Sequence, residues 1–205
     1  TDVKPLRSIS AVTDASSVPL NVRTQLAACG VVLAESADEL PEPGDFLAWQ
    51  QASVTGRRNA LRHHSPWPAV APWPTVSILL SSHRSDRLAH ALSMVRAQDY
   101  PNLQVIVVLH GDDDFVSHHT PNVHQSLVGW SGDLVVMGVS PEQTLGHALA
   151  AASARAEGEL LAKMDDDDFY SATHIWDLVL ARMYSGAQIV GKALDWIYLT
   201  HADTT

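Results

Sequence analysis

From Thr75 onward, short apolar runs alternate with segments of helical periodicity, and this alternation constrains the fold more than any other feature. Residues 76–81 form an apolar run, as expected for a parallel strand that is covered on both faces. Residues 86–98 follow with apolar side chains at helical spacing: Leu88, Ala91, Leu92 and Val95. Strands that alternate with helices in this way predict a doubly wound, mostly parallel α/β sheet.

The same alternation continues toward the C-terminus. Further strands are expected at 103–109, 133–139, 160–164, 188–192 and 196–199, and further helices at 145–155 and 172–184. The segment between the second and third strands is polar, and we expect a loop there.

The first 64 residues have a different pattern and predict a small α/β appendage. A short helix is expected at 21–29, a strand at 31–34, and a longer helix at 45–63 with Asp45 as its N-cap. Residues 65–74 are rich in proline and tryptophan, and proline neither continues a helix nor sits in a central strand. We therefore expect an accessory segment at 1–64, a linker at 65–74 whose tryptophans pin it to one module, and a main domain at 75–205.

Four consecutive carboxylates, Asp165 to Asp168, follow the strand expected at 160–164. Like charges held this close usually indicate a bound cation. The alternative is a solvated acidic turn in which Asp168 or Ser171 caps the next helix. The position of this acidic tetrad at the carboxyl end of a parallel strand, where open α/β sheets bind ligands, favours the cation site. Aspartate oxygens with no thiolate nearby favour Mg²⁺ or Mn²⁺ over zinc.

A second cluster, at 110–124, holds four histidines and three aspartates. Its spacings match no standard zinc motif, so a polar loop is the preferred interpretation. His110 and Asp112 are the exceptions, because they lie closest to the end of the strand at 103–109. We expect His63 and His64 to end a helix, and His83 or His90 to be ordinary surface residues. The sequence contains neither a G-x-G-x-x-G loop nor a P-loop.

Charge and cysteine content exclude several classes of function. The formal net charge of −10 argues against nucleic acid as a partner. No apolar run approaches the roughly 18 residues of a membrane span. Cys29 is the only cysteine, which fits a reducing cytoplasm, and its apolar neighbours predict a small buried side chain.

Four segments, taken together, resemble the family 2 glycosyltransferases in order and spacing. They are the run 75–84, the segment from Leu88 through 97–108, Ala156-Glu-Gly-Glu159, and Met164 with the tetrad. The resemblance covers about 75–199 and implies the nucleotide-binding half of a GT-A fold. It also implies transfer of a sugar from a nucleotide diphosphate donor to an acceptor hydroxyl, usually with inversion.

The resemblance also implies roles for individual residues. Asp165 matches the first acidic position of the D-x-D motif, near the ribose and diphosphate, and Asp167 matches the metal-ligand position. His110 and Asp112 are added because they lie closest to the end of the strand at 103–109. The expected donor-binding residues are therefore Ser81, Ser82, His83, Arg84, His110, Asp112, Asp165 and Asp166. The expected ligands for Mn²⁺ or Mg²⁺ are Asp165, Asp167 and Asp168.

The sequence departs from the family pattern in several places. Leu109 and His110 replace an acidic pair that reads the base in many members, with Asp112 as a substitute. Leu149-Ala-Ala-Ala152 replaces a common Arg-Asn-x-Gly motif. No general base is recognisable, since Asp195 and Asp203 lie in no base motif, and we expect the chain to be a fragment that lacks the acceptor half.

Two other functions stay open on the sequence alone. A nucleotidyltransferase would use a similar sheet and acidic site, but would be expected to carry a glycine- and lysine-containing triphosphate loop. A non-catalytic α/β interaction module that binds nucleotide or metal is the second alternative. The acceptor, the sugar and the base are not specified by the residues.

Overall fold

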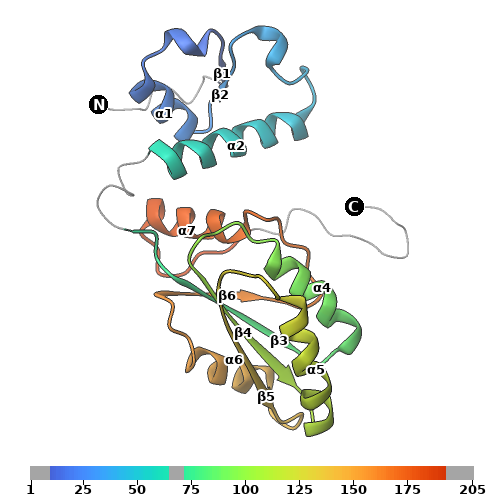
Figure 1. Cartoon of the computed structure of the whole chain (residues 1–205). Coiled ribbons are helices and arrows are strands. Elements are labelled where there is room, and N and C mark those ends of the chain that lie inside the picture. Colours follow the sequence, from blue (N-terminus) through green and yellow to red (C-terminus); the bar gives the residue numbers. More distant parts are fainter. Residues whose placement is uncertain (1–9, 65–71, 193–205) are drawn as a thin grey trace. The chain divides into compact units, whose positions relative to one another are not determined.

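The computed structural model of the chain describes residues 10–64 and 72–192. The chain divides into two compact units, residues 1–72 and residues 73–205 (Figure 1).

The first unit pairs a minimal parallel sheet with two helices. Strand β1 (Ala11–Val12) lies beside β2 (Val32–Leu33), and the helices are α1 (Leu20–Ala28) and α2 (Phe46–His64). Two 3-10 turns, Ala15–Ser17 and Ala37–Glu39, complete it. The predicted N-cap is confirmed, since the Asp45 carboxylate accepts the Ala48 N–H at 2.9 Å.

The second unit is built on a four-stranded parallel sheet with the order β5-β4-β3-β6. The strands are β3 (Val76–Ser82), β4 (Leu103–His110), β5 (Asp133–Val139) and β6 (Leu160–Met164). The helices are α4 (Ser85–Arg96), α5 (Asp113–Ser126), α6 (Leu145–Ser153) and α7 (His174–Ser185).

Helices cover both faces of this sheet, as the apolar strands predicted. Helix α6 packs its small residues Ala148 and Ala152 on one face, against Leu79, Ile106 and Val108. Helices α4 and α5 pack on β3, β4 and β5 from the other face (Figure 1). The doubly wound parallel α/β fold is therefore confirmed, with helix and strand limits within one or two residues of most predictions.

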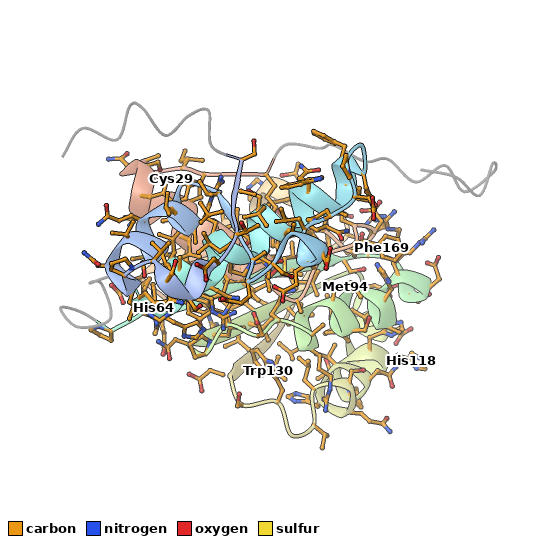
Figure 2. All side chains as sticks on the ribbon, turned by 90° about the horizontal axis from the view of Figure 1, so that it is seen from above. Cys29, His64, Met94, His118, Trp130 and Phe169 are labelled. Carbon is orange, nitrogen blue, oxygen red and sulfur yellow. The ribbon has the colours of Figure 1, made fainter. Side chains whose placement is uncertain are left out.

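Three local predictions are wrong. The polar segment after β4 is the helix α5, not a loop; Asp112 caps it, and buried Val123 anchors it. Residues 188–192 do not form a strand, and Ile189 is 91% exposed there. Cys29 is exposed rather than buried, because it lies at the C-terminal end of α1 (Figure 2). The strand expected at 196–199 lies outside the described residues.

One linker tryptophan is fixed as predicted. The indole of Trp73 packs edge-on against Trp176 of α7, with ring centroids 4.9 Å apart. The hydroxyl of Tyr100 donates to the Pro74 carbonyl at 2.6 Å and holds the same end of the linker. Trp67 lies outside the described residues. Within 10–64 and 72–192, no helix has both the length and the apolar character needed to cross a membrane.

Candidate functional site

The acidic tetrad lies beside the end of β3, because β3 and β6 are neighbours. In the parallel register Leu80 pairs with Met164, so both strands leave the sheet at the same edge. Strand β3 ends at Ser82 and is followed by Arg84, and the segment after β6 carries the four aspartates. Residues more than 80 positions apart in sequence therefore meet at the carboxyl edge of the sheet, where open α/β sheets bind ligands.

Asp166 is the buried member of the tetrad. Its Oδ2 accepts hydrogen bonds from the Ser82 hydroxyl at 2.6 Å and from Arg84 Nε at 3.2 Å. Its Oδ1 contacts Arg84 Nη2, which completes a bidentate pair. Burial raises the pKa of the Asp166 carboxyl, but the hydrogen bonds from Arg84 and Ser82 outweigh it, so the pKa is lowered. Asp166 is thus an ionised carboxylate whose two oxygens are both occupied.

Asp167 is the exposed member that shares the same cation. Its Oδ2 lies 3.0 Å from Arg84 Nη2. The side chain of Asp167 is 50% exposed, whereas that of Asp166 is 6% exposed. The hydrogen bonds to Asp166 and then Asp167 raise the pKa of Arg84, so the guanidinium stays charged. Asp167 therefore offers solvent-facing carboxylate oxygen beside a fixed positive charge.

Asp165 belongs to a separate pair within the same turn. Both of its carboxylate oxygens contact the Lys163 ammonium, which lies two residues earlier on β6. Its backbone N–H donates to the Tyr170 hydroxyl at 2.8 Å, and that hydroxyl donates to Asp168 Oδ2 at 3.2 Å. Burial is the main cause that raises the pKa of Tyr170 to about 12, so the phenol stays protonated and holds the turn closed.

The end of the tetrad lies against α4. The imidazole of His90 donates from Nε2 to the Asp168 carbonyl at 3.0 Å, and its ring lies edge-on to Phe169 with centroids 4.7 Å apart. His90 is thus a surface residue of α4 whose imidazole contacts the end of the tetrad. Neither Asp168 nor Ser171 caps α7, since Thr173 holds the N-cap position.

The candidates after β4 lie at the same carboxyl edge. His110 ends β4, and its Nε2 donates to the Gln143 carbonyl at 2.9 Å. His110 and His83 face each other with ring centroids 6.4 Å apart. The Asp112 carboxylate accepts the Phe115 N–H at 2.8 Å, so capping α5 uses one of its oxygens. His83 and His110 thus line the edge between β3 and β4.

The carboxylates of this edge do not form a complete metal cage by themselves. Within the described residues, no group of three or more histidine, cysteine or acidic side chains is arranged to hold a metal ion. Mg²⁺ and related hard cations are commonly held by one or two carboxylates together with substrate phosphates and water. The half-exposed Asp167 fits this second kind of site, and the fully occupied Asp166 does not.

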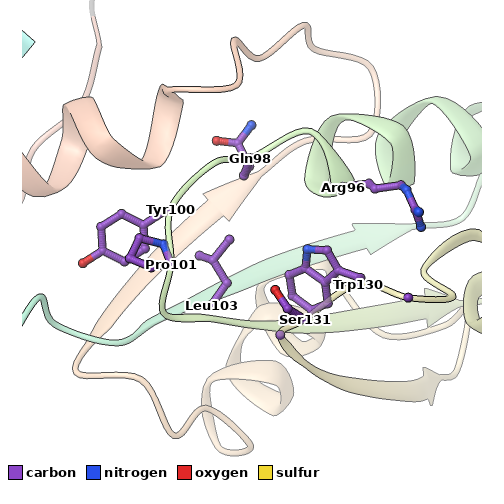
Figure 3. A pocket seen from close by; sticks show the side chains of 9 residues that line it. Arg96, Gln98, Tyr100, Pro101, Leu103, Trp130 and Ser131 are labelled. Atoms are coloured by element: carbon purple, nitrogen blue, oxygen red, sulfur yellow. The ribbon is translucent and has the colours of Figure 1, made fainter.

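A cavity of about 250 Å³ lies at the opposite edge of the sheet, where β4 and β5 begin (Figure 3). It is lined by Arg96, Gln98, Tyr100, Pro101, Leu103, Gly129, Trp130, Ser131 and Gly132. Arg96 already donates from Nη1 to the carbonyls of Ser126 and Val128 at 3.0 and 2.9 Å. Because the tetrad lies at the carboxyl ends of the strands, this cavity is separate from the candidate site.

Several contributors were not predicted from sequence. Lys163 precedes Asp165 by two positions. Because residues two apart in an extended chain lie on one face, contact between Lys163 and Asp165 could have been predicted from the sequence. Tyr170 carried no signal, because its hydroxyl reaches back across a turn. His90 lies 78 residues from Asp168, a separation that local sequence patterns do not cover.

A comparison with protein-family models decides the family. The model "Glycosyl transferase family 2" matches residues 77–198, more than half of the chain. The chain belongs to glycosyl transferase family 2. The matched family 2 segment begins in β3 and includes the tetrad, so the resemblance noted from the four sequence segments is confirmed. A comparison with curated protein sequences finds no match.

Solved structures similar to this family 2 chain include the 1–349 part of TarS from S. aureus, at 17% identity and a TM-score of 0.47. That match covers 62% of this chain and 40% of the other. The mannosyltransferase PcManGT from Pyrobaculum calidifontis, in complex with GDP-Man and Mn²⁺, matches at 22% identity and a TM-score of 0.42. It covers 63% of this chain and 42% of the other. The chain thus spans about two fifths of the length of each.

Proposed function

We propose that this chain binds the donor in a metal-dependent, inverting glycosyltransferase that moves a sugar from a nucleotide diphosphate to an acceptor hydroxyl. One observation carries the proposal: in a family 2 chain, the acidic tetrad lies at the carboxyl end of β6, beside the end of β3. The net charge of −10 argues against nucleic acid as the ligand. The single cysteine favours a cytoplasmic location.

In this proposal the four aspartates have different roles. Asp167 is the main ligand of Mn²⁺ or Mg²⁺, and Asp168 lies beside it as a supporting carboxylate. Asp165 can join them only if its oxygens exchange the Lys163 ammonium for the metal. Asp166 holds Arg84 in place together with Ser82. When bound, the metal neutralises the charge of the departing nucleoside diphosphate.

The nucleoside is assigned to the edge between β3 and β4. Ser81, His83 and His110 lie there, and Asp112 stands at the N-terminus of α5. No residue of this chain is assigned as the general base that deprotonates the acceptor. The chain's part in the reaction is to hold the donor with its diphosphate over the tetrad.

Thermal unfolding in the presence of probes tests the proposal against a non-catalytic module. UDP and GDP are suitable probes, each added with and without Mn²⁺ to the full chain. A nucleotide present at 100 times its Kd stabilises the fold by about 2.7 kcal/mol, which raises the unfolding midpoint by several degrees. A midpoint that responds to neither nucleotide in the presence of Mn²⁺ contradicts donor binding and favours a non-catalytic module that does not bind nucleotide.

A further inference from the structure

Arg84 contacts two carboxylates of very different exposure. It forms a bidentate pair with buried Asp166 and a single 3.0 Å contact with half-exposed Asp167. Both contacts are made by the same guanidinium, but they differ in how easily another ion could replace them. A bidentate pair with a buried carboxylate is strong and fixed in geometry, whereas a single contact to an exposed carboxylate is weak.

Asp166 holds the guanidinium in position. Its carboxylate oxygens accept hydrogen bonds from the Arg84 guanidinium and from the Ser82 hydroxyl. The Ser82 hydroxyl oxygen in turn accepts a hydrogen bond from the Arg84 backbone N–H at 3.2 Å. Loss of the ion pair would leave a buried carboxylate with one remaining side-chain donor, which is costly. The Arg84–Asp166 pair is therefore retained while the site changes its ligands.

Asp167 is the partner that can be exchanged. Its side chain is half exposed, and its contact with Arg84 is one ion pair at the rim of the site. A divalent cation on Asp167 would lie close to that guanidinium, which contacts Oδ2 of the same carboxylate, and repulsion between the two positive charges favours loss of the contact. The N–H group that the exchange frees is a donor suited to phosphate oxygens.

We propose that Arg84 is the counter-cation of Asp167 in the metal-free site, and that a divalent metal must displace it while Asp166 keeps the guanidinium within reach. This inference rests on the proposed function, since it takes Asp167 as the metal ligand. Two consequences follow. Mn²⁺ alone binds more weakly than it would to an unpaired Asp167, and nucleotide diphosphate promotes metal binding by offering Arg84 a new anionic partner.

Binding of Mn²⁺ alone tests the exchange, measured as loss of the free-ion electron paramagnetic resonance signal. The double variant Arg84→Gln with Asp166→Asn removes the competing cation, leaves the net charge unchanged and leaves no unpaired buried carboxylate. The variant Arg84→Lys retains the positive charge beside both carboxylates, which one guanidinium nitrogen contacts in the wild type, and serves as the charge-retaining comparison. The matched control is Arg87→Gln with Asp86→Asn, which removes a neighbouring 3.5 Å pair of α4 that does not touch the tetrad.

The double variant is expected to bind Mn²⁺ alone about three- to fivefold more tightly than wild type, as loss of one rim ion pair implies, whereas Arg84→Lys should stay closer to wild type. The control should stay within about twofold of wild type. An Mn²⁺ affinity of the double variant equal to that of wild type overturns the exchange, even if wild type binds UDP or GDP with Mn²⁺. Absence of Mn²⁺-dependent nucleotide binding in wild type overturns the proposed function, and the exchange fails with it.

Discussion

Arg84 and Asp166 form a bidentate ion pair that joins the carboxyl ends of β3 and β6, although the two residues are 82 positions apart. The pair is partly shielded from water, and Ser82 completes its hydrogen bonding. The same contact therefore contributes to the stability of the sheet edge and to the arrangement of the tetrad.

Truncation of Arg84 should destabilise the fold. Arg84→Ala leaves the buried Asp166 carboxylate with Ser82 as its side-chain donor, and we expect a loss of roughly 2–3 kcal/mol in the free energy of unfolding. Urea denaturation measures this loss. Arg87→Ala is the control, because Arg87 forms an exposed pair with Asp86 and should cost less than about 0.5 kcal/mol. Equal losses in the two variants would contradict a structural role for the Arg84–Asp166 pair.

Removal of the Tyr170 hydroxyl should loosen the turn of the tetrad. In Tyr170→Phe the Asp165 N–H loses its acceptor and Asp168 loses a donor. We expect a cost of about 1 kcal/mol in stability and weaker binding of Mn²⁺ with UDP or GDP. Urea denaturation and calorimetry check the two effects. Tyr184→Phe, at an exposed tyrosine of α7, is the control and should change neither quantity. Unchanged stability in Tyr170→Phe would show that the hydroxyl does not hold the turn.

Gly158 allows a close approach between the start of β6 and β3. A Cβ at this position would lie 2.5 Å from the Ser77 nitrogen and 2.9 Å from the Val76 carbonyl carbon, both backbone atoms. Gly158→Ala should therefore cost about 1–3 kcal/mol in stability. Gly146→Ala in α6 is the matched substitution, since its Cβ meets nothing closer than 3.6 Å, and it should stabilise by about 0.5–1 kcal/mol. The same sign in both variants, seen in thermal or urea unfolding, would contradict this packing.

His174 should make the fold sensitive to mild acid. Burial lowers the pKa of this imidazole from 6.5 to about 4, with a further decrease from Lys192 that Asp177 opposes. The unfolded chain takes up a proton at higher pH than the folded chain, so stability is complete above pH 6.5 and falls as pH decreases toward 4. His174→Gln should remove this part of the pH dependence, roughly 1–2 kcal/mol after solvent screening.

Denaturation at several pH values between about 7 and 4 measures this difference. His124→Gln is the control, since His124 is an exposed histidine of α5. This control should keep the acid dependence of the wild-type chain. If His174→Gln also keeps that dependence, burial of His174 does not cause it.

The sheet was predictable because burial on both faces makes its strands almost continuously apolar. Helices α4 and α6 were predictable from their spacing, since one face of each packs on the sheet. Helix α5 was not, because its histidines, aspartates and Pro121 obscure an apolar stripe of Val116, Val123 and Leu127. The strand at 188–192 was expected from a short apolar run, but Gly186 ends α7 with a φ of 68° and the chain beyond it exposes Ile189.

The location of the site could be predicted from the sequence, because the tetrad follows a parallel strand. Which of the four aspartates is buried and which is exposed could not be predicted. Four identical residues in a row give no sequence signal that separates a buried carboxylate from an exposed one. The ion pair with Arg84 distinguishes Asp166 from the other aspartates, and Arg84 reaches Asp166 only because β3 and β6 are adjacent. Pairing between distant segments is a tertiary property, which local patterns do not encode.

Asp167 is the carboxylate through which we propose that metal and nucleotide bind. Calorimetric titration of the full chain with UDP and with GDP, with and without Mn²⁺, measures this directly in wild type and in Asp167→Asn. Asp133→Asn is the charge-matched control, since Asp133 is exposed at the start of β5, at the opposite edge of the sheet. We predict binding that requires Mn²⁺, is retained in Asp133→Asn and falls at least about tenfold in Asp167→Asn. Nucleotide binding that is independent of Mn²⁺, or unchanged in Asp167→Asn, would contradict the role of Asp167 as the metal ligand.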